Sequence, residues 1–267
     1  MDDFKKYLVR LNLATNTINA YVIAVKNYFS CFNEINKNNL LAWKSKLIEE
    51  FKAKTVNLKI QAMNNYLVFI KKAYLKIKSI KVQQRLFLEN VISDSDYEFF
   101  KKKLKKEQNK EWYFIVRFLA ATGSRISELI KIKVEHVKIG FIDIYTKGGK
   151  IRRIYIPKAL RKEAEIWIEE ELKINSGYIF NNRYGKRITS RGISQQLKKF
   201  AFKYGIDTKV VYPHSFRHRF AKNFLEKYND ISLLADLMGH ESIETTRIYL
   251  RKTASEQQEI VDKIVVW

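Results

Sequence analysis

The first 122 residues of this chain contain neither glycine nor proline, since the first glycine is Gly123 and the first proline is Pro157. These two residues are the strongest local breakers of regular structure, so their absence favours helices. Within residues 1–80, apolar residues recur at helical spacing in four segments, which predicts a small helical bundle. The segments are carried by Phe4, Tyr7, Leu8 and Leu11; by Ile18, Tyr21, Val22, Val25, Tyr28 and Phe29; by Leu40, Trp43, Leu47 and Ile48; and by Leu58, Ile60, Met63, Tyr66, Leu67, Phe69 and Ile70. Thr15 or Asn16 is expected to cap the second helix.

The pattern changes after residue 92, where helices are expected at 94–105, 111–121, 158–172, 190–204, 214–228, 231–238 and 243–250. Two alternating segments, 141–146 and 151–156, flank Lys-Gly-Gly-Lys and predict an antiparallel hairpin. The fold class is therefore mainly α with a small antiparallel β-sheet, a helical domain preceding a mixed α+β domain. Residues 71–88 are basic and lack a helical stripe, so they are interpreted as connecting sequence. The expected boundaries are a domain at 1–80, a linker at 81–92 and a second domain at 93–267.

The charge balance restricts the partner. The formal net charge is +23, and both parts are basic: residues 1–91 hold 16 Lys and Arg against 6 Asp and Glu, and the rest hold 35 against 22. A polyanion would relieve the self-repulsion, so nucleic acid is favoured over the plainer reading of a lysine-rich solvated surface. A membrane is disfavoured because no apolar run of about 18 residues is present. The acidic start does not resemble a secretory signal, so a cytoplasmic, nucleoid-associated protein is expected.

The single cysteine, Cys31, rules out an internal disulfide and a Cys-based zinc site, and its aromatic neighbours predict a buried small apolar residue. Three histidines lie near arginines late in the chain, as His214, Arg217, His218 and His240. The pair His214 and His218 could bind a metal, but no acidic third ligand accompanies it. Arginine beside histidine instead suits a phosphate, because a guanidinium binds two oxygens and keeps its charge. No metal and no cofactor are expected.

Four segments resemble the catalytic motifs of the tyrosine recombinase (phage integrase) family, in the family's order and spacing. Residues 121–129 (ATGSRISEL) resemble its first box, residues 213–221 (PHSFRHRFA) its His-x-x-Arg box, and residues 237–249 (LMGHESIETTRIY) the box that ends in the nucleophile. Lys147 matches the family's β-hairpin lysine. The resemblance covers about 90–255, and residues 1–80 resemble the family's core-binding domain, which implies two domains that form a clamp around DNA.

The resemblance implies roles for six residues. Tyr249 would attack the scissile phosphorus to form a 3′-phosphotyrosyl bond, Arg125 and Arg217 would bind the non-bridging oxygens, and Lys147, with Lys150 as the alternative, would protonate the leaving 5′-oxygen. His214 would carry a proton, and His240 would donate a hydrogen bond to the phosphate. Glu128 is expected to orient a catalytic arginine, His218 to be structural, and His136 to be unrelated. Taken singly, Tyr249 could be a core aromatic and Arg125 a surface arginine.

Contacts to DNA outside the catalytic set are expected from several basic or amide side chains. Arg219 stands where the family often has Thr or Ser, and it could reach a neighbouring phosphate. The helix near residues 190–195 and the second or fourth helix of the 1–80 domain are the candidates for reading base edges in a groove, since Arg suits guanine and Gln suits adenine. The expected DNA-binding residues are Lys44, Lys46, Lys150, Arg191, Gln195 and Arg219.

The chain resembles simple Xer-like or mobile-element recombinases that lack an arm-binding domain, which implies strand exchange between two DNA sites through a Holliday junction. The C-terminal tail carries Ile260, Val261, Ile264, Val265 and Trp267. Tail exchange of the family's kind would close a homotetramer on paired sites, with a related recombinase or accessory protein as a further partner. The alternatives are a type IB topoisomerase, which shares the chemistry, and a DNA-binding protein without activity.

Overall fold

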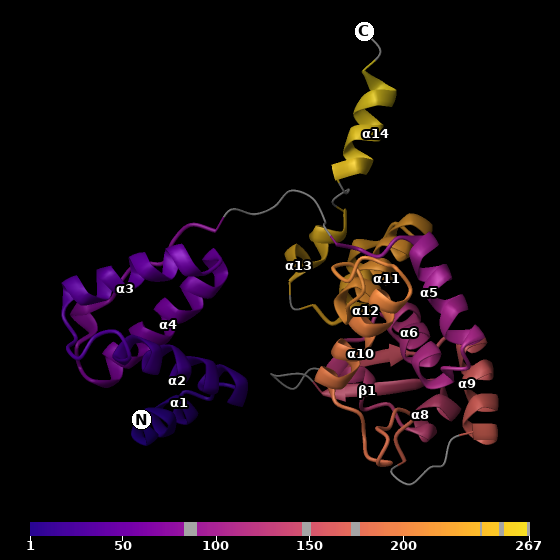
Figure 1. Cartoon of the computed structure of the whole chain (residues 1–267), viewed down its shortest axis with the longest axis horizontal. Coiled ribbons are helices and arrows are strands. Elements are labelled where there is room, and N and C mark those ends of the chain that lie inside the picture. The colour runs from indigo at the N-terminus through magenta and orange to yellow at the C-terminus, as the bar shows by residue number, and fades with distance from the viewer. Residues whose placement is uncertain (83–89, 146–150, 172–176, 241, 251–253, 266–267) are drawn as a thin grey trace. The chain divides into compact units, whose positions relative to one another are not determined.

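The computed structural model describes residues 1–82, 90–145, 151–171, 177–240, 242–250 and 254–265 (Figure 1). The chain divides into two compact units, Met1–Gln84 and Arg85–Trp267. In the described part of the chain, no helix is both long and apolar enough to cross a bilayer.

The first unit is a bundle of four helices. They are α1 (Asp2–Arg10), α2 (Thr15–Phe29), α3 (Lys37–Glu50) and α4 (Ala53–Phe69), followed by the short 3₁₀ helix η1 (Ala73–Leu75). Each helix supplies a fully buried side chain, namely Leu8, Tyr28, Trp43 and Met63, so the predicted bundle is confirmed. The aromatic core includes an edge-to-face contact between Tyr28 and Trp43, whose ring centroids are 5.5 Å apart.

Some expectations for this unit were wrong. The residue that precedes α2 is Ala14, which has no side-chain oxygen to cap the helix, and Thr15 is the first helical residue. Cys31 is exposed, because it lies in the turn after α2 rather than on the helix face toward the core. Leu11, Ile48 and Leu58, at the edges of the apolar stripes, are also exposed.

Residues 73–80, called the strap below, pack on the bundle. The side chain of Asn64 accepts a hydrogen bond from the backbone N–H of Ile77 (3.0 Å) and donates one to the carbonyl of the same residue (2.9 Å). Asn57 binds the backbone of Ile80 in the same way, at 2.8 and 2.9 Å. Ile77 is buried in the core of the unit. The interpretation of 71–88 as connecting sequence is therefore wrong for the strap, because asparagine carries the donor and the acceptor that an extended backbone needs.

The second unit contains the small sheet. Strands β1 (Phe141–Tyr145) and β2 (Ile151–Tyr155) pair antiparallel, with Phe141 opposite Tyr155 and Tyr145 opposite Ile151. The helices of this unit are α5 (Asp94–Lys106), α6 (Lys110–Thr122), α7 (Ile126–Leu129), α8 (Val134–Ile139), α9 (Lys158–Glu171), α10 (Ser190–Lys203), α11 (Pro213–Lys227), α12 (Ile231–Met238), α13 (Ile243–Arg247), the 3₁₀ helix η2 (Ile248–Leu250) and α14 (Ala254–Ile264). The expected strands and longer helices are confirmed to within one residue at most ends, and the hairpin turn lies outside the described residues.

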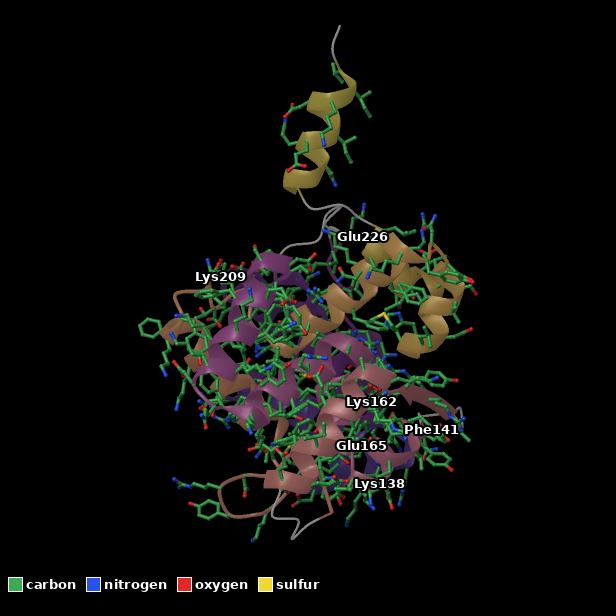
Figure 2. All side chains as sticks on the ribbon, turned by 90° about the vertical axis from the view of Figure 1, so that its right-hand side faces the viewer. Lys138, Phe141, Lys162, Glu165, Lys209 and Glu226 are labelled. Atoms are coloured by element: carbon green, nitrogen blue, oxygen red, sulfur yellow. The ribbon has the colours of Figure 1, made fainter. Side chains whose placement is uncertain are left out.

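The main core of the second unit surrounds α6, whose Ile115, Phe118 and Leu119 are completely buried. Helix α8 packs against α9 and β1. Figure 2 shows this end of the unit, where Lys138 of α8, Phe141 of β1 and Lys162 of α9 are labelled. Helix α8 was not expected, because it has only six residues and ends at once at Gly140, whose φ is +88°. Such a segment is too short to show a helical period.

A smaller core cluster lies beside the main one and joins α11, α12 and η2. Its buried members include Leu225 of α11, Leu234 and Met238 of α12, and Tyr249 of η2. The cluster fixes the carboxyl end of α12 against α11, and in doing so it places Tyr249 among the polar side chains described next.

Candidate active site

The carboxyl end of α6 begins the site. The helix stops at Gly123, which adopts a left-handed conformation with φ of +59°. A Cβ atom at this position would lie 2.4 Å from the ring of Phe220, so the position requires glycine both for its backbone angle and for its close packing. Two residues later, Arg125 precedes the first turn of α7.

The buried carboxylate of Glu128 joins two arginines. One of its oxygens accepts a hydrogen bond from the guanidinium of Arg125 (2.9 Å), and the other accepts from the backbone N–H of Arg125 (2.7 Å) and from the guanidinium of Arg152. Burial acts to raise the pKa of Glu128, but the charge of Arg152 and these hydrogen bonds outweigh it and hold the pKa below its usual value. Glu128 is therefore a carboxylate that fixes Arg125, in the position expected of an orienting residue.

Arg217, on the inner face of α11, is buried and bound by backbone carbonyls. Its guanidinium donates to the carbonyl of Gly123 (2.5 Å) and to that of Met238 (2.7 Å), and it lies 3.0 Å from Nε2 of His240. Burial, together with the charges of Arg125 and Arg152, lowers the pKa of Arg217 to about 10, so the group is still cationic near neutral pH.

Three consecutive carbonyls at the end of α12 each bind one arginine. The carbonyl of Leu237 accepts from Nε of Arg152 (2.9 Å), that of Met238 accepts from Arg217, and that of Gly239 accepts from Nη2 of Arg125 (3.0 Å). The last carbonyls of a helix have no partner within the helix and carry its partial negative charge. The end of α12 therefore gathers guanidinium groups that come from the residue before α7, from β2 and from α11.

His240 follows this helix end and bridges to α13. Its Nδ1 lies 2.7 Å from the hydroxyl of Thr246, and its Nε2 faces Arg217. Because a guanidinium only donates, Nε2 is an acceptor here and Nδ1 carries the proton that is donated to Thr246. Burial and the nearby arginines lower the pKa of His240 to about 4, so the ring is neutral. His240 is expected to donate a hydrogen bond to a phosphate. To do so from Nε2, the ring must gain a proton on that nitrogen and give up its contact with Arg217.

Tyr249 lies inside this arrangement. Its side chain is buried, and its ring stacks on His240 with centroids 6.1 Å apart and contacts His218 at 5.3 Å. Burial raises the pKa of Tyr249, while a hydrogen bond and the positive charge from Arg217 partly oppose the shift. A phenol held against a guanidinium, with a second arginine near it, has the components needed to attack a phosphate and stabilise the charge that develops.

Two further histidines, His214 and His218, lie on α11, one turn apart. His214 follows Pro213 at the start of the helix and is exposed, so it can exchange protons with a substrate or solvent. Partial burial and then the charges of Arg217 and Arg125 lower the pKa of His214. The pKa of His218 is lowered to about 4, mainly by burial. Among the residues that the structure describes, no three His, Cys, Asp or Glu side chains are placed to hold a metal ion.

The structure thus brings together Arg125, Arg217, His240 and Tyr249, with His214 beside them. Lys147 and Lys150 lie outside the described residues. Arg191 and Gln195 are both exposed on α10, one turn apart.

The other expected DNA-binding residues make contacts within the protein. Arg219 forms an ion pair with Asp94 (2.8 Å), and its guanidinium lies 4.0 Å from the centre of the Tyr97 ring. This placement does not favour a phosphate contact, because the guanidinium of Arg219 is mostly covered by α5. In the first unit, Lys44 donates to the carbonyl of Lys78 at 2.8 Å. The exposed Lys46 lies 3.9 Å from Glu50.

Sequence reasoning missed Arg152 and Thr246. Arg152 could have been found, because strand alternation places it on the same face as Ile154, and a charged residue on the apolar face of a strand requires a buried partner. The part played by Thr246 depends on how the chain folds between α12 and α13, for which the sequence carries no signal.

Comparison with known proteins identifies the family of the chain. Residues 90–256 match the phage integrase family. The tyrosine recombinase XerA of Pyrococcus horikoshii is 30% identical over 98% of this chain and 92% of its own length, and that of Pyrococcus furiosus is 27% identical over 98% and 93%. Among solved structures, the Tn1549 transposon integrase in complex with circular intermediate DNA aligns with a TM-score of 0.74 at 15% identity, over 98% of this chain and 99% of that one. XerH bound to a difH substrate in a post-cleavage complex aligns with a TM-score of 0.72 at 19% identity, over 96% and 81%. The chain therefore belongs to the phage integrase family, the tyrosine recombinases.

Proposed function

We propose that this protein is a site-specific DNA recombinase that cleaves and rejoins DNA through a covalent bond between Tyr249 and a 3′-phosphate. The observation that carries the proposal is the buried ring of Tyr249 stacked on His240, whose Nε2 lies 3.0 Å from the guanidinium of Arg217, in a cluster that also holds Arg125. The arrangement combines a nucleophile with fixed positive charge, as metal-free cleavage of a phosphodiester requires.

In the proposed reaction, the Tyr249 oxygen attacks the phosphorus and the bond from phosphorus to the 5′-oxygen breaks. The phenol proton leaves during attack, since a group of raised pKa is a poor nucleophile in its neutral form, and the exposed His214 is the acceptor we assign. Arg125 and Arg217 bind the non-bridging oxygens. Lys147 supplies the proton to the 5′-oxygen, an assignment that rests on the family resemblance. Attack by a 5′-hydroxyl from a second duplex reverses the step, so no ATP is consumed.

The test uses covalent trapping. The full-length protein is incubated with fragmented genomic DNA, and the DNA that stays attached after denaturation is sequenced to identify the cleavage site. A duplex with that site and a nick beside it then traps the adduct on a denaturing gel. Tyr249→Phe should bind the duplex and form no adduct, whereas Tyr212→Phe, a change at a half-buried tyrosine near Tyr249, should form it. Adduct formation by Tyr249→Phe would assign the nucleophile elsewhere.

A type IB topoisomerase would use the same chemistry, but it is not favoured, because the relatives that align over nearly the whole chain are named recombinases. We propose strand exchange between paired sites through a Holliday junction. Two duplexes with the trapped site should yield recombinant strands. Relaxation of a supercoiled plasmid without recombinant product would support the topoisomerase instead.

We further propose that both basic units contact double-stranded DNA. The exposed pair Arg191 and Gln195 on α10 is the surface that we assign to groove reading. Salt dependence tests which side chains meet phosphate, since each phosphate contact adds about 0.9 to the slope of log affinity against log salt. Lys46→Gln should lower this slope, while Arg191→Gln should also change the preferred sequence.

We also propose that α14 assembles the protein into a tetramer on synapsed DNA by docking on a neighbouring protomer. The support is apolar exposure on this amphipathic helix and at the residue after it: Val261, Ile264 and Val265 are 51%, 59% and 47% exposed. The double variant Val261→Ser and Ile264→Ser should abolish tetramers on paired sites in sedimentation experiments, as should truncation after Thr253. Asp262→Ser should assemble normally. Tetramers of unchanged stability in the double variant would refute the docking.

A further inference from the structure

Arg152 is the one arginine of the cluster at the end of α12 to which no role in the reaction has been assigned above. Its side chain is only 3% exposed, and it points from β2 into the unit, between Glu128 and the carbonyl of Leu237. We assign it no phosphate contact, because its Nη1 and Nε are occupied by Glu128 and by the carbonyl of Leu237. Its position must therefore serve other groups of the protein.

Two contacts of Arg152 connect it with both arginines of the proposed clamp. Through Nη1 it shares the Glu128 carboxylate with Arg125, and its charge helps keep that carboxylate ionised. Through Nε it binds the carbonyl of Leu237, next to the carbonyls that hold Arg217 and Arg125. A shift of Arg152 would therefore move both the carboxylate and the helix end that orient the clamp.

Gly239 makes this contact possible. Its φ is +60°, and a Cβ atom there would lie 2.2 Å from Cδ of Arg152, so the side chain of Arg152 runs directly against the backbone of the turn that leads to His240. The neighbouring residue, Arg153, has a different environment on the outer face of the strand. It forms two hydrogen bonds of 2.8 Å with Asp143 and stacks on Phe141.

We propose that Arg152 is a positioning residue for the reaction, which holds Arg125 and Arg217 in the geometry that binds the two non-bridging phosphate oxygens. The inference rests on the proposed function. The proposal also implies that Arg152 and Glu128 position Arg125 and Arg217 together, so that loss of either residue has the same effect as loss of both. It also differs from a role in stability alone, because the effect of Arg152 must depend on the negative charge of the substrate phosphate.

The experiment compares two substrates with the full-length protein. One is the nicked duplex with the trapped cleavage site, and the other is the same duplex with a methylphosphonate at the scissile position, in which a methyl group replaces one non-bridging oxygen and removes the charge. Single-turnover strand cleavage is measured for wild type and for Arg152→Gln, with both methylphosphonate stereoisomers. Because loss of one oxyanion donor slows reactions about 10²–10³-fold, Arg152→Gln should slow cleavage of the natural phosphate by roughly that factor. Its defect on the methylphosphonate should be about tenfold or less, because there the clamp has less charge to bind.

Arg153→Gln is the matched control and should cleave both substrates at the wild-type rate. The combined variant Arg152→Gln with Glu128→Gln should be no slower than the slower single variant. If Arg152→Gln lacks a cooperative thermal transition, Arg152→Lys replaces it, since lysine keeps the charge but cannot serve Glu128 and Leu237 together.

Equal defects on the two substrates would overturn the proposal, as would a rate for Arg152→Gln equal to that of Arg153→Gln. If the rate losses of the two single variants multiplied in the combined variant, Arg152 and Glu128 would act independently, and their joint positioning role would be refuted. Failure of the proposed function has a different signature, because wild type itself would then form no adduct with any DNA.

Discussion

Replacement of Gly123 by alanine should destabilise the second unit by an amount that the structure allows us to divide into two terms. The first is the left-handed backbone, with φ of +59°, which costs an L-residue about 1–2 kcal/mol. The second is the contact of the new Cβ with Phe220, at 2.4 Å from Cδ1 and 2.8 Å from Cε1. Forcing an extra methyl into a packed site costs about 1–3 kcal/mol. The sum is about 2–5 kcal/mol.

Gly205→Ala isolates the first term. Gly205 also has a left-handed backbone, with φ of +69°, but no atom lies within 4 Å of a Cβ built on it. At about 2–4 °C per kcal/mol for a unit of this size, Gly123→Ala should lower the melting temperature roughly 2–12 °C further than Gly205→Ala does. Scanning calorimetry on the full chain measures both variants in the transition of the second unit. Coinciding melting temperatures would refute the packing argument.

The same substitution should also slow cleavage, because the carbonyl of Gly123 accepts a hydrogen bond from Arg217. The tilt of that peptide needed to relieve the contact with Phe220 would carry the carbonyl away from the guanidinium. Gly205→Ala should leave the cleavage rate unchanged. A normal rate in Gly123→Ala, at a temperature where the variant is folded, would show that this carbonyl is dispensable for placing Arg217.

Further predictions concern pH, an ion pair and the strap. The pKa of His218 in the folded protein is about 4, below the usual 6.5, so the unfolded chain binds more protons between these pH values. Stability should therefore fall as the pH drops from about 6.5 to 4. His218→Gln should make the melting temperature depend less steeply on pH over this range, and an unchanged slope would contradict the assignment. Arg219→Gln should lower the melting temperature by a few degrees through loss of its pair with Asp94, but should leave the salt dependence of DNA binding unchanged, as filter binding can show. Asn64→Ala should cost about 1–3 kcal/mol in urea unfolding, because the backbone of Ile77 loses both partners. Asn65→Ala, at a half-buried residue whose own hydrogen bond to the Gln61 carbonyl is solvent-exposed, should change stability by less than about 0.5 kcal/mol.

The fold was predictable wherever an apolar period extended over a long enough segment or a glycine or proline marked its end. Helix α12 was expected at its observed bounds, and the structure shows that Asp230 caps its start and Gly239 ends it. The strap was not predictable, since its burial depends on Asn57 and Asn64 of α4, and nothing in the sequence marks asparagines on a helix as partners for a distant backbone. Cys31 shows a similar limit, because aromatic neighbours in sequence do not indicate on which side of a turn a residue lies.

The site was predictable in its members and less so in its connections. The motif resemblance identified Arg125, Arg217, His240 and Tyr249, and the structure brings them together. The carbonyls that bind the arginines have no signature in the sequence, because every residue carries one. The protonation of His240 was likewise beyond sequence reasoning, since it follows from burial and from the direction in which Arg217 donates.

The use of carbonyls to hold the arginines determines how much charge the site can offer to DNA. Carboxylates would orient guanidinium groups equally well, but each would cancel one positive charge. The carbonyls of residues 237–239 are dipoles and cancel none. Among the residues that the structure describes, Glu128 is the one counter-ion in direct contact with Arg125, Arg152 or Arg217. About two positive charges are left uncompensated. A phosphodiester approaches a doubly negative state as its fifth oxygen bond forms, and the resting protein is already matched to that charge.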